Sequence, residues 1–317
     1  MSTPFTVACI QLNSGRELGP NIETTQRLVR EARRAGAAFI LTPENTTCIE
    51  PKRELILAKA QPEASHPAIP AFSALAAETG AWLLIGSLTI KLDDKTCANR
   101  SFLFDPKGGI AARYDKIHMF DVDLANGERY RESATFRPGH QAVTADLPWG
   151  RLGLTICYDL RFAYLYRALA QAGAGFISIP AAFTRPTGQA HWHVLMRARA
   201  IETGCFVFAP AQTGEHAEGR KTYGHSLIVA PWGEVLADAG EEEGFVTARI
   251  DPAKIAEARG MVPALTHDRG FSPPPAEGLR VAESSEASSP RSRNGLFRAD
   301  HRSVYNFPGM QEISALA

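Results

Sequence analysis

The 317-residue sequence has no excess of charge of either sign and no long apolar stretch. Its 34 Lys and Arg residues balance 34 Asp and Glu residues, so net charge does not direct the chain to nucleic acid or to an anionic membrane. No apolar run approaches the ~18 residues of a membrane span, and the N-terminus lacks the basic and apolar regions of a signal peptide. We therefore expect a cytoplasmic protein that binds neither nucleic acid nor membrane.

Sequence motifs for metal ions, disulfides and a catalytic serine are also missing. The five cysteines are odd in number, scattered and never spaced as CxxC, which argues against a disulfide framework or a zinc knuckle. No GxSxG motif is present. His191 and His193 stand two residues apart in a segment with helical spacing, so they point to different faces and we expect no shared ion.

The order of the expected elements indicates the fold class. Strands and helices alternate in two similar blocks with hairpins between them, which predicts a layered α/β fold with two sheets face to face and helices outside. The charged, Gly- and Pro-rich segment 117–148 is predicted to be a functional loop. We assign residues 1–271 to one domain. Residues 272–317, which begin with a Pro- and Ser-rich stretch, are predicted to be a linker and tail that is disordered or extended, or that docks on a subunit surface.

The stretch 151–162 places a cysteine between a predicted strand and a predicted helix. Apolar residues alternate up to Ile156, and a helical pattern begins at Leu160 with Asp159 as the expected N-cap. Cys157 would lie in the turn, where backbone N–H groups and the helix dipole favour a thiolate over a thiol. It is therefore a candidate nucleophile, and the alternative is a small buried hydrophobic residue.

Two further polar residues follow predicted strands. Glu44 comes after the apolar segment 37–42, and Lys116 comes after segment 110–115. Strand ends at one edge of a sheet converge in space, so both side chains can meet Cys157 there. A thiol that attacks a carbonyl needs a base for its proton and a positive charge for the oxyanion, which Glu44 and Lys116 would supply. The alternative for each is a solvated turn residue.

Four motifs in this order resemble the signatures of the nitrilase (carbon–nitrogen hydrolase) superfamily: PEN at 43–45, DKIHMFD at 115–121, RES at 131–133 and CYDLRF at 157–162. The resemblance extends over residues 5–269. It implies a four-layer α-β-β-α sandwich that forms a homodimer or a higher homo-oligomer. It also implies an enzyme that works without a metal ion or an organic cofactor.

Carried over by position, the resemblance implies a Glu–Lys–Cys triad. Glu44 would be the general base, Lys116 the oxyanion donor and Cys157 the nucleophile. Glu132 matches an additional glutamate of the family, which hydrogen-bonds near the lysine and helps to position the substrate. The backbone N–H of Tyr158 would complete the oxyanion hole.

Segments 183–203 and 223–236 are similar to the Nit branch of that superfamily, whose members include amidases for deaminated glutathione and ω-amidases. This implies an amidase that cleaves the linear C–N bond of a small carboxylated amide through a cysteine thioester and releases ammonia, in the manner of a deaminated glutathione amidase. An ω-amidase, an N-carbamoyl amidase, a nitrilase and a catalytically silent scaffold are the alternatives. We hypothesise that Arg161 or Arg185 meets the substrate carboxylate, the alternative for each being a structural ion pair.

Overall fold

The computed structural model describes residues 3–124 and 127–272. The chain divides into two compact units, Met1–Arg269 and Gly270–Ala317. Every helix and strand given below belongs to the first unit. The predicted tail lies outside the described residues except for residue 272, and the domain boundary expected after residue 271 stays a prediction.

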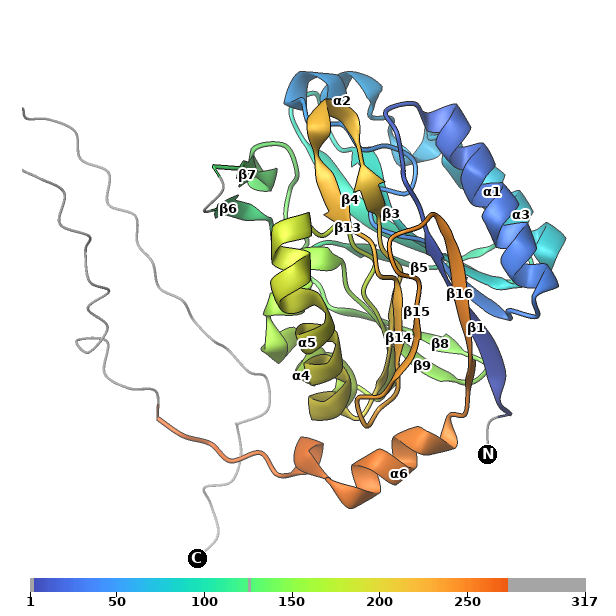
Figure 1. Cartoon of the computed structure of the whole chain (residues 1–317), viewed down its shortest axis with the longest axis vertical. Helices are drawn as coiled ribbons and strands as arrows, with labels where there is room; N and C mark the ends of the chain where they lie inside the picture. The colour runs from blue at the N-terminus through green and yellow to red at the C-terminus, as the bar shows by residue number, and fades with distance from the viewer. Residues whose placement is uncertain (1–2, 125–126, 273–317) are drawn as a thin grey trace, which may run out of the picture. The chain divides into compact units, whose positions relative to one another are not determined.

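Two six-stranded sheets lie at the centre of the described part of the first unit (Figure 1). Their strand orders are β16-β1-β2-β3-β4-β5 and β15-β14-β11-β10-β9-β8. The first sheet consists of β1 (Phe5–Gln11), β2 (Phe39–Leu41), β3 (Trp82–Lys91), β4 (Cys97–Phe104), β5 (Ile110–Asp115) and β16 (Gly244–Ile250). The second consists of β8 (Val143–Leu147), β9 (Gly150–Leu154), β10 (Ala174–Ser178), β11 (Phe206–Ala209), β14 (Leu227–Val229) and β15 (Val235–Asp238). Two small hairpins pair β6 (Asp121–Asp123) with β7 (Arg129–Arg131), and β12 (Thr213–Glu215) with β13 (Lys221–Tyr223).

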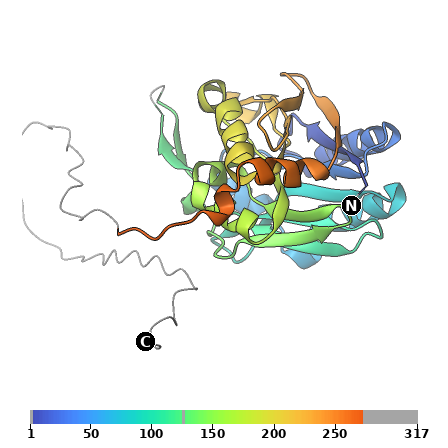
Figure 2. The same ribbon diagram turned by 90° about the horizontal axis from the view of Figure 1, so that it is seen from below.

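Helices cover the outer faces of both sheets. The first sheet carries α1 (Leu18–Arg34) and α3 (Ala68–Thr79), and the second carries α4 (Ala163–Gln171) and α5 (Arg185–Thr203), as Figures 1 and 2 show. The other α-helices of the described residues are α2 (Arg53–Lys59) and α6 (Ala253–Met261). The arrangement confirms the predicted four-layer sandwich. The helices within residues 3–124 and 127–272 are all too short or too polar to span a lipid bilayer.

Alternate side chains of β1 pack in two different apolar clusters, one on each face of the first sheet. Val7 and Cys9 pack in the apolar cluster that fills the space between the sheets. Ala8 and Ile10 point the other way and pack in the cluster beneath α1 and α3. Successive side chains of a strand face opposite sides, so a strand covered on both faces is apolar throughout.

Two expectations about secondary structure are wrong. Segment 117–148 is not a loop throughout, because it contains β6, β7 and the edge strand β8, which pairs antiparallel with β9. Charged, Gly and Pro residues interrupt its apolar residues throughout, so no long periodic run marked these short strands. The helix expected at 160–172 begins only at Ala163, because Cys157–Arg161 forms a 3₁₀ turn.

Gly86 in β3 lets the loops at the ends of the two sheets approach each other. A Cβ atom at this position would lie 2.4 Å from the carbonyl oxygen of Pro43 and 2.5 Å from the Cβ of Pro180. Pro43 precedes Glu44, and the carbonyl of Pro180 accepts the backbone N–H of Cys157 at 2.9 Å. A residue without a side chain is therefore required where these two loops meet.

Candidate active site

The three polar residues expected at strand ends meet in one buried place. Glu44 and Lys116 follow β2 and β5 of the first sheet, while Cys157 follows β9 of the second. Each is at most 7% exposed. The Lys116 Nζ atom lies 2.9 Å from Glu44 Oε1, and the Cys157 thiol hydrogen-bonds to the Glu44 carboxylate. The structure thus brings together a carboxylate, an ammonium group and a thiol from three regions of the sequence.

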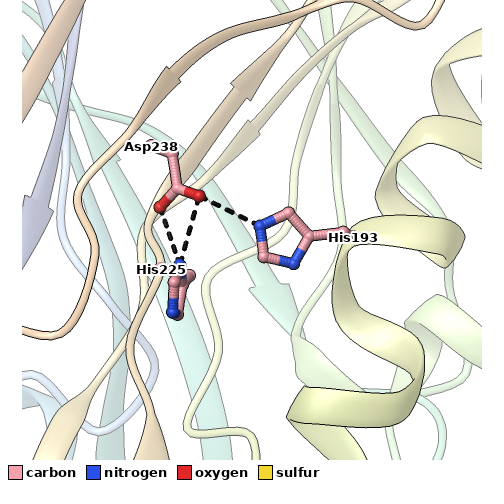
Figure 3. A group of neighbouring side chains, drawn as sticks. All are labelled: His193, His225 and Asp238. Carbon is pink, nitrogen blue, oxygen red and sulfur yellow. Dashed lines mark hydrogen bonds and ion pairs between the residues drawn. The ribbon is translucent and has the colours of Figure 1, made fainter.

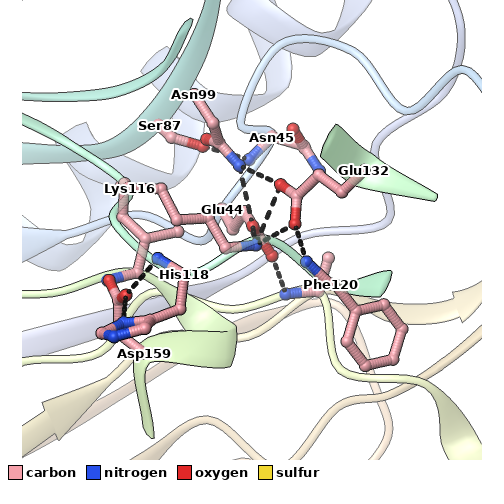
Figure 4. Close-up of polar contacts among 12 residues, drawn as sticks. Glu44, Asn45, Ser87, Asn99, Lys116, His118, Phe120, Glu132 and Asp159 are labelled. Carbon is pink, nitrogen blue, oxygen red and sulfur yellow. Dashed lines mark hydrogen bonds and ion pairs between the residues drawn. The ribbon is translucent and has the colours of Figure 1, made fainter. Parts of the chain in front are cut away.

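Glu132 completes this group, which we call the catalytic cluster: Glu44, Lys116, Glu132 and Cys157. Figure 4 shows Glu44, Lys116 and Glu132 with their polar contacts. The ammonium of Lys116 lies 3.0 and 2.8 Å from the two carboxylate oxygens of Glu132. The Asn99 amide donates to Glu44 at 2.9 Å and to Glu132 at 3.2 Å. The ammonium group is therefore shared by two carboxylates, and one amide links both of them.

Glu44 is held from both sheets. Asn99 of β4 binds its Oε1 atom, and the backbone N–H of Ala182, which follows β10, donates to Oε2 at 2.9 Å. The next residue, Asn45, has a φ of 57° and donates its N–H to the Ser87 hydroxyl at 2.8 Å. This left-handed conformation turns the chain sharply directly after the carboxylate. The contacts from Asn99 and Ala182 therefore fix the orientation of the Glu44 carboxylate.

Opposite charges keep Glu44 and Lys116 ionised in spite of their burial. Burial would raise the pKa of Glu44, but the Lys116 charge and hydrogen bonds from Lys116 and Cys157 hold it below the ordinary value of glutamate. Burial would lower the pKa of Lys116, but the carboxylates of Glu132 and Glu44 raise it well above the ordinary value of lysine. A buried ion without such partners costs on the order of several kcal/mol.

Cys157 lies in a strained turn and carries its proton at rest. Its φ is 47°, a left-handed value that is costly for a residue with a side chain. Burial and the negative charge of Glu44 raise the pKa of the Cys157 thiol well above its ordinary value, although Lys116 opposes this. The expected preference for a thiolate is therefore wrong for the resting protein. No α-helix begins at this turn, and Glu44 is the group placed to take the proton.

The sequence pattern indicated that Asp159 caps an α-helix, but in the structure it lies inside the 3₁₀ turn Cys157–Arg161. It is fully buried, and its Oδ2 atom accepts the backbone N–H of Ile156 at 2.9 Å and the hydroxyl of Tyr114 at 2.6 Å. Its Oδ1 atom accepts the backbone N–H of His118 at 3.0 Å and lies 2.7 Å from His118 Nδ1. Asp159 thus ties the turn that carries Cys157 to the end of β5 and the loop after it.

A cavity of about 650 Å³ opens onto the catalytic cluster and is lined by all four of its residues. This volume is typical of small-molecule sites, which range from roughly 300 to 1,000 Å³. Tyr158, which directly follows Cys157, also lines the cavity. The predicted role of its N–H group stays a prediction.

Arg161 and Arg185 are not among the residues that line this cavity. The Arg185 guanidinium lies 2.9 and 3.0 Å from the two carboxylate oxygens of Glu241. The Arg161 guanidinium lies 3.3 Å from Nδ1 of His191 and over the ring of Phe183. The cavity lining thus gives no support to their expected contact with a substrate carboxylate, and the ion-pair alternative describes Arg185.

Two residues of the site carry no recognisable sequence signal, Asn99 and Arg220. Arg220 lines the cavity, donates to the carbonyl of Ala182 at 3.1 Å and lies over the ring of Tyr130 at 5.6 Å. Its buried Nε atom has no hydrogen-bond partner within the described part of the chain. Arg220 reaches the cavity from the β12–β13 hairpin, which no sequence pattern predicted.

Comparisons with known proteins agree with this geometry. The chain matches the carbon–nitrogen hydrolase family over residues 6–260. It is 38% identical over 273 residues to the deaminated glutathione amidase of Yersinia enterocolitica, covering 83% of this chain and 92% of that protein. Nit3 from Saccharomyces cerevisiae, a member of branch 10 of the nitrilase superfamily, has a TM-score of 0.75 and 29% identity, covering 86% of this chain and 98% of Nit3.

A third relative is the amidase from Nesterenkonia sp. AN1, a mutant of which was solved with the acetamide moiety of fluoroacetamide added covalently at its active-site cysteine. It has a TM-score of 0.69 and 25% identity, covering 80% of this chain and 92% of that one. Together with Nit3, it confirms the expected fold, and the relatives confirm the likeness to the Nit branch. The chain belongs to the carbon–nitrogen hydrolase family and is an enzyme that hydrolyses carbon–nitrogen bonds other than peptide bonds.

Proposed function

We propose that this enzyme cleaves a small carboxylated amide with Cys157 as the nucleophile, Glu44 as the general base and Lys116 as the oxyanion donor. The observation that carries the proposal is that all three side chains line one cavity, with Glu44 in contact with both of the others. The Nesterenkonia amidase supports thiol chemistry, because its active-site cysteine accepts the acetamide moiety.

Acylation begins when Glu44 takes the proton of the Cys157 thiol. The resulting thiolate attacks the amide carbon, and negative charge develops on the carbonyl oxygen. The Lys116 ammonium and the Tyr158 N–H stabilise this oxyanion. Glu44 then gives the proton to the leaving nitrogen, so the C–N bond breaks, an amine departs and a thioester remains on Cys157.

Deacylation uses the same groups with water as the nucleophile. Glu44 takes a proton from water, and the hydroxide attacks the thioester carbon. The C–S bond breaks, the acid leaves and the Cys157 sulfur recovers its proton from Glu44. Glu132 holds the Lys116 ammonium at 2.8 and 3.0 Å throughout, so the charge that meets the oxyanion is already in position.

We propose that the substrate has an anionic end, as deaminated glutathione does, and that Arg220 binds it. Arg220 brings a cation to the cavity wall with one donor still unpaired in the described part of the chain. A guanidinium recognises a carboxylate through charge-assisted hydrogen bonds. The assignment moves carboxylate recognition from Arg161 and Arg185, the residues first expected to do it, to a residue that lines the cavity.

The test is amide hydrolysis by the wild-type enzyme and by Cys157→Ala. Deaminated glutathione releases cysteinylglycine, an amine, rather than the ammonia first expected, so the assay follows the free amine and the keto acid. We expect turnover in the wild type and a loss of about 10⁴-fold or more in Cys157→Ala. The matched control is Cys205→Ala, which removes a buried thiol that does not line the cavity and keeps full activity.

The alternatives separate in the same set of assays. Faster release of ammonia from α-ketoglutaramate or from a carbamoyl amine favours an ω-amidase or an N-carbamoyl amidase, and turnover of a nitrile faster than its matching amide favours a nitrilase. A silent scaffold would show no turnover, and iodoacetamide would label its Cys157 no faster than Cys205. None of these alternatives is favoured by a specific feature of the cavity.

We also propose that the enzyme works as a homodimer in the reducing cytoplasm. Apolar side chains are exposed on α4 and α5, with Tyr164 at 52%, Val194 at 69% and Ile201 at 54%. An exposed apolar surface of this kind is typical of a protein interface. The five cysteines are free, and a thiol nucleophile requires reducing conditions. Sedimentation that shows only monomer at micromolar concentration would overturn the dimer, and Val194→Asp should weaken it.

A further inference from the structure

A second group of titratable side chains lies outside the active-site cavity. We call His193, His225 and Asp238 the His–Asp cluster (Figure 3). His193 comes from α5, His225 from the residues before β14 and Asp238 from the end of β15. None of the three lines the cavity of the catalytic cluster. His191, two residues before His193, faces Arg161 instead and does not take part.

The polar atoms of the His–Asp cluster converge on one point. Asp238 Oδ2 lies 3.0 Å from His193 Nε2 and 3.1 Å from His225 Nδ1, and Asp238 Oδ1 lies 2.9 Å from the same His225 nitrogen. All three donor atoms lie within 4.8 Å of one another. In a tetrahedral zinc site with bonds of ~2.0 Å, donor atoms are about 3.3 Å apart. The distances from Asp238 to the two imidazoles are already close to this value, and the imidazole nitrogens, which lie at most 4.8 Å apart, would move together around an ion.

The surrounding structure orients two of the donors. The N–H of Gly240 donates to Asp238 Oδ1 at 2.9 Å. His225 has a φ of 55°, and its carbonyl accepts the indole N–H of Trp192 at 2.8 Å. Its ring stacks on Tyr223, with ring centroids 4.5 Å apart. Supporting contacts of this kind hold metal ligands in place, and the left-handed backbone at His225 is a conformation that persists only when its surroundings enforce it.

We propose that the His–Asp cluster is a surface binding site for one divalent transition metal ion of the zinc type. Two imidazole nitrogens and one carboxylate oxygen form a donor set that suits Zn²⁺ and Co²⁺ rather than Ca²⁺ or Mg²⁺. The side chains are 21% to 35% exposed, so water can reach the fourth position. A bound ion would cross-link α5 to the β14–β15 hairpin without taking part in the amidase reaction.

The test is a cobalt titration of tag-free, full-length protein after treatment with EDTA. Co²⁺ reports four-coordinate binding through its visible absorption, and Zn²⁺ then competes for the same site. The experiment is done in Cys157→Ser, so that the reactive thiol cannot contribute a ligand. We expect one equivalent to bind, with an increase in the melting temperature, because an ion that binds only the folded state stabilises it.

The variants decide whether the three named residues hold the ion. His193→Gln and Asp238→Asn should each weaken binding by tenfold or more and remove the increase in melting temperature. His191→Gln, on the same helix but outside the cluster, should bind like the parent protein. Absence of the cobalt absorption in the parent protein would overturn the proposal, and so would binding in His193→Gln and Asp238→Asn that is as strong as in the parent protein.

Discussion

The catalytic cluster and the His–Asp cluster both join side chains from distant parts of the chain, but in different surroundings. Lys116 is 2% exposed and has one carboxylate on each side. In the His–Asp cluster the side chains are 21% to 35% exposed, so water competes for every contact. We infer that burial sets how much free energy is lost when one partner of an ion pair is removed.

Lys116→Met should have the largest effect, because it leaves Glu44 and Glu132 buried without their cation. Breaking a buried ion pair costs roughly 3–5 kcal/mol of the free energy of unfolding, and losing one oxyanion donor costs on the order of 10²–10³-fold in kcat. Denaturant unfolding at neutral pH and amidase kinetics measure the two losses. In the exposed pair Lys254–Glu257, Lys254→Met should leave both quantities unchanged. If Lys116→Met and Lys254→Met have equal free energies of unfolding, burial does not set the cost of losing an ion-pair partner.

Arg220→Gln should have an intermediate effect that depends on the substrate. Loss of one charge-assisted contact is expected to lower kcat/KM for an anionic amide by about 10–100-fold. A neutral amide of similar size should be much less affected. The control is Arg185→Gln, since Arg185 pairs with Glu241 outside the cavity. If both substrates lose the same factor, Arg220 has a general structural role instead.

Asp238→Asn should have a small effect in the absence of metal. Its two imidazole partners are partly exposed, so the free energy of unfolding should fall by about 1 kcal/mol or less, and by less at high salt. Amidase kinetics should stay at the wild-type level, because the residue does not line the cavity. Denaturant unfolding at two salt concentrations measures the change. A loss comparable with that of Lys116→Met would show that exposure does not protect this cluster.

Activity should depend least on pH in the neutral range. The pKa of Glu44 lies below the ordinary value of glutamate, while the pKa values of Lys116 and Cys157 lie well above theirs. We therefore expect kcat/KM to be flat between about pH 5.5 and about pH 8.5. The stability that comes from ionised Glu44 is present above the ordinary glutamate pKa and is lost as the pH falls through the lowered one. A kinetic pKa near 7 would contradict this account.

The residues whose meeting in space could be predicted from the sequence are those that follow apolar strands. Glu44, Lys116 and Cys157 each follow such a strand, and the motifs around them place them in one family, so their meeting could be predicted. Arg220 could not be found, because its hairpin has neither a periodic pattern nor a motif. Arg161 was chosen for its nearness to Cys157 along the chain, which does not determine where a side chain points.

The protonation of Cys157 shows a second limit of sequence reasoning. A turn between a strand and a helix predicts a lowered thiol pKa. In the folded protein, burial and the charge of Glu44 raise it, and both are properties of residues that meet only through the fold. The same reason explains β8, a five-residue strand whose pairing with β9 is visible only in the fold. Local patterns thus predicted which residues meet in the cavity, but not the charge state of the thiol.

The most direct test of the proposed mechanism is to look for the acyl group on the enzyme. Wild-type protein is mixed with deaminated glutathione, quenched in acid during steady-state turnover and digested for mass spectrometry. We predict a keto-acyl adduct on the peptide that contains Cys157, and its removal by hydroxylamine, as expected of a thioester. Turnover with the adduct on another cysteine, or turnover that persists in Cys157→Ala, would contradict the account.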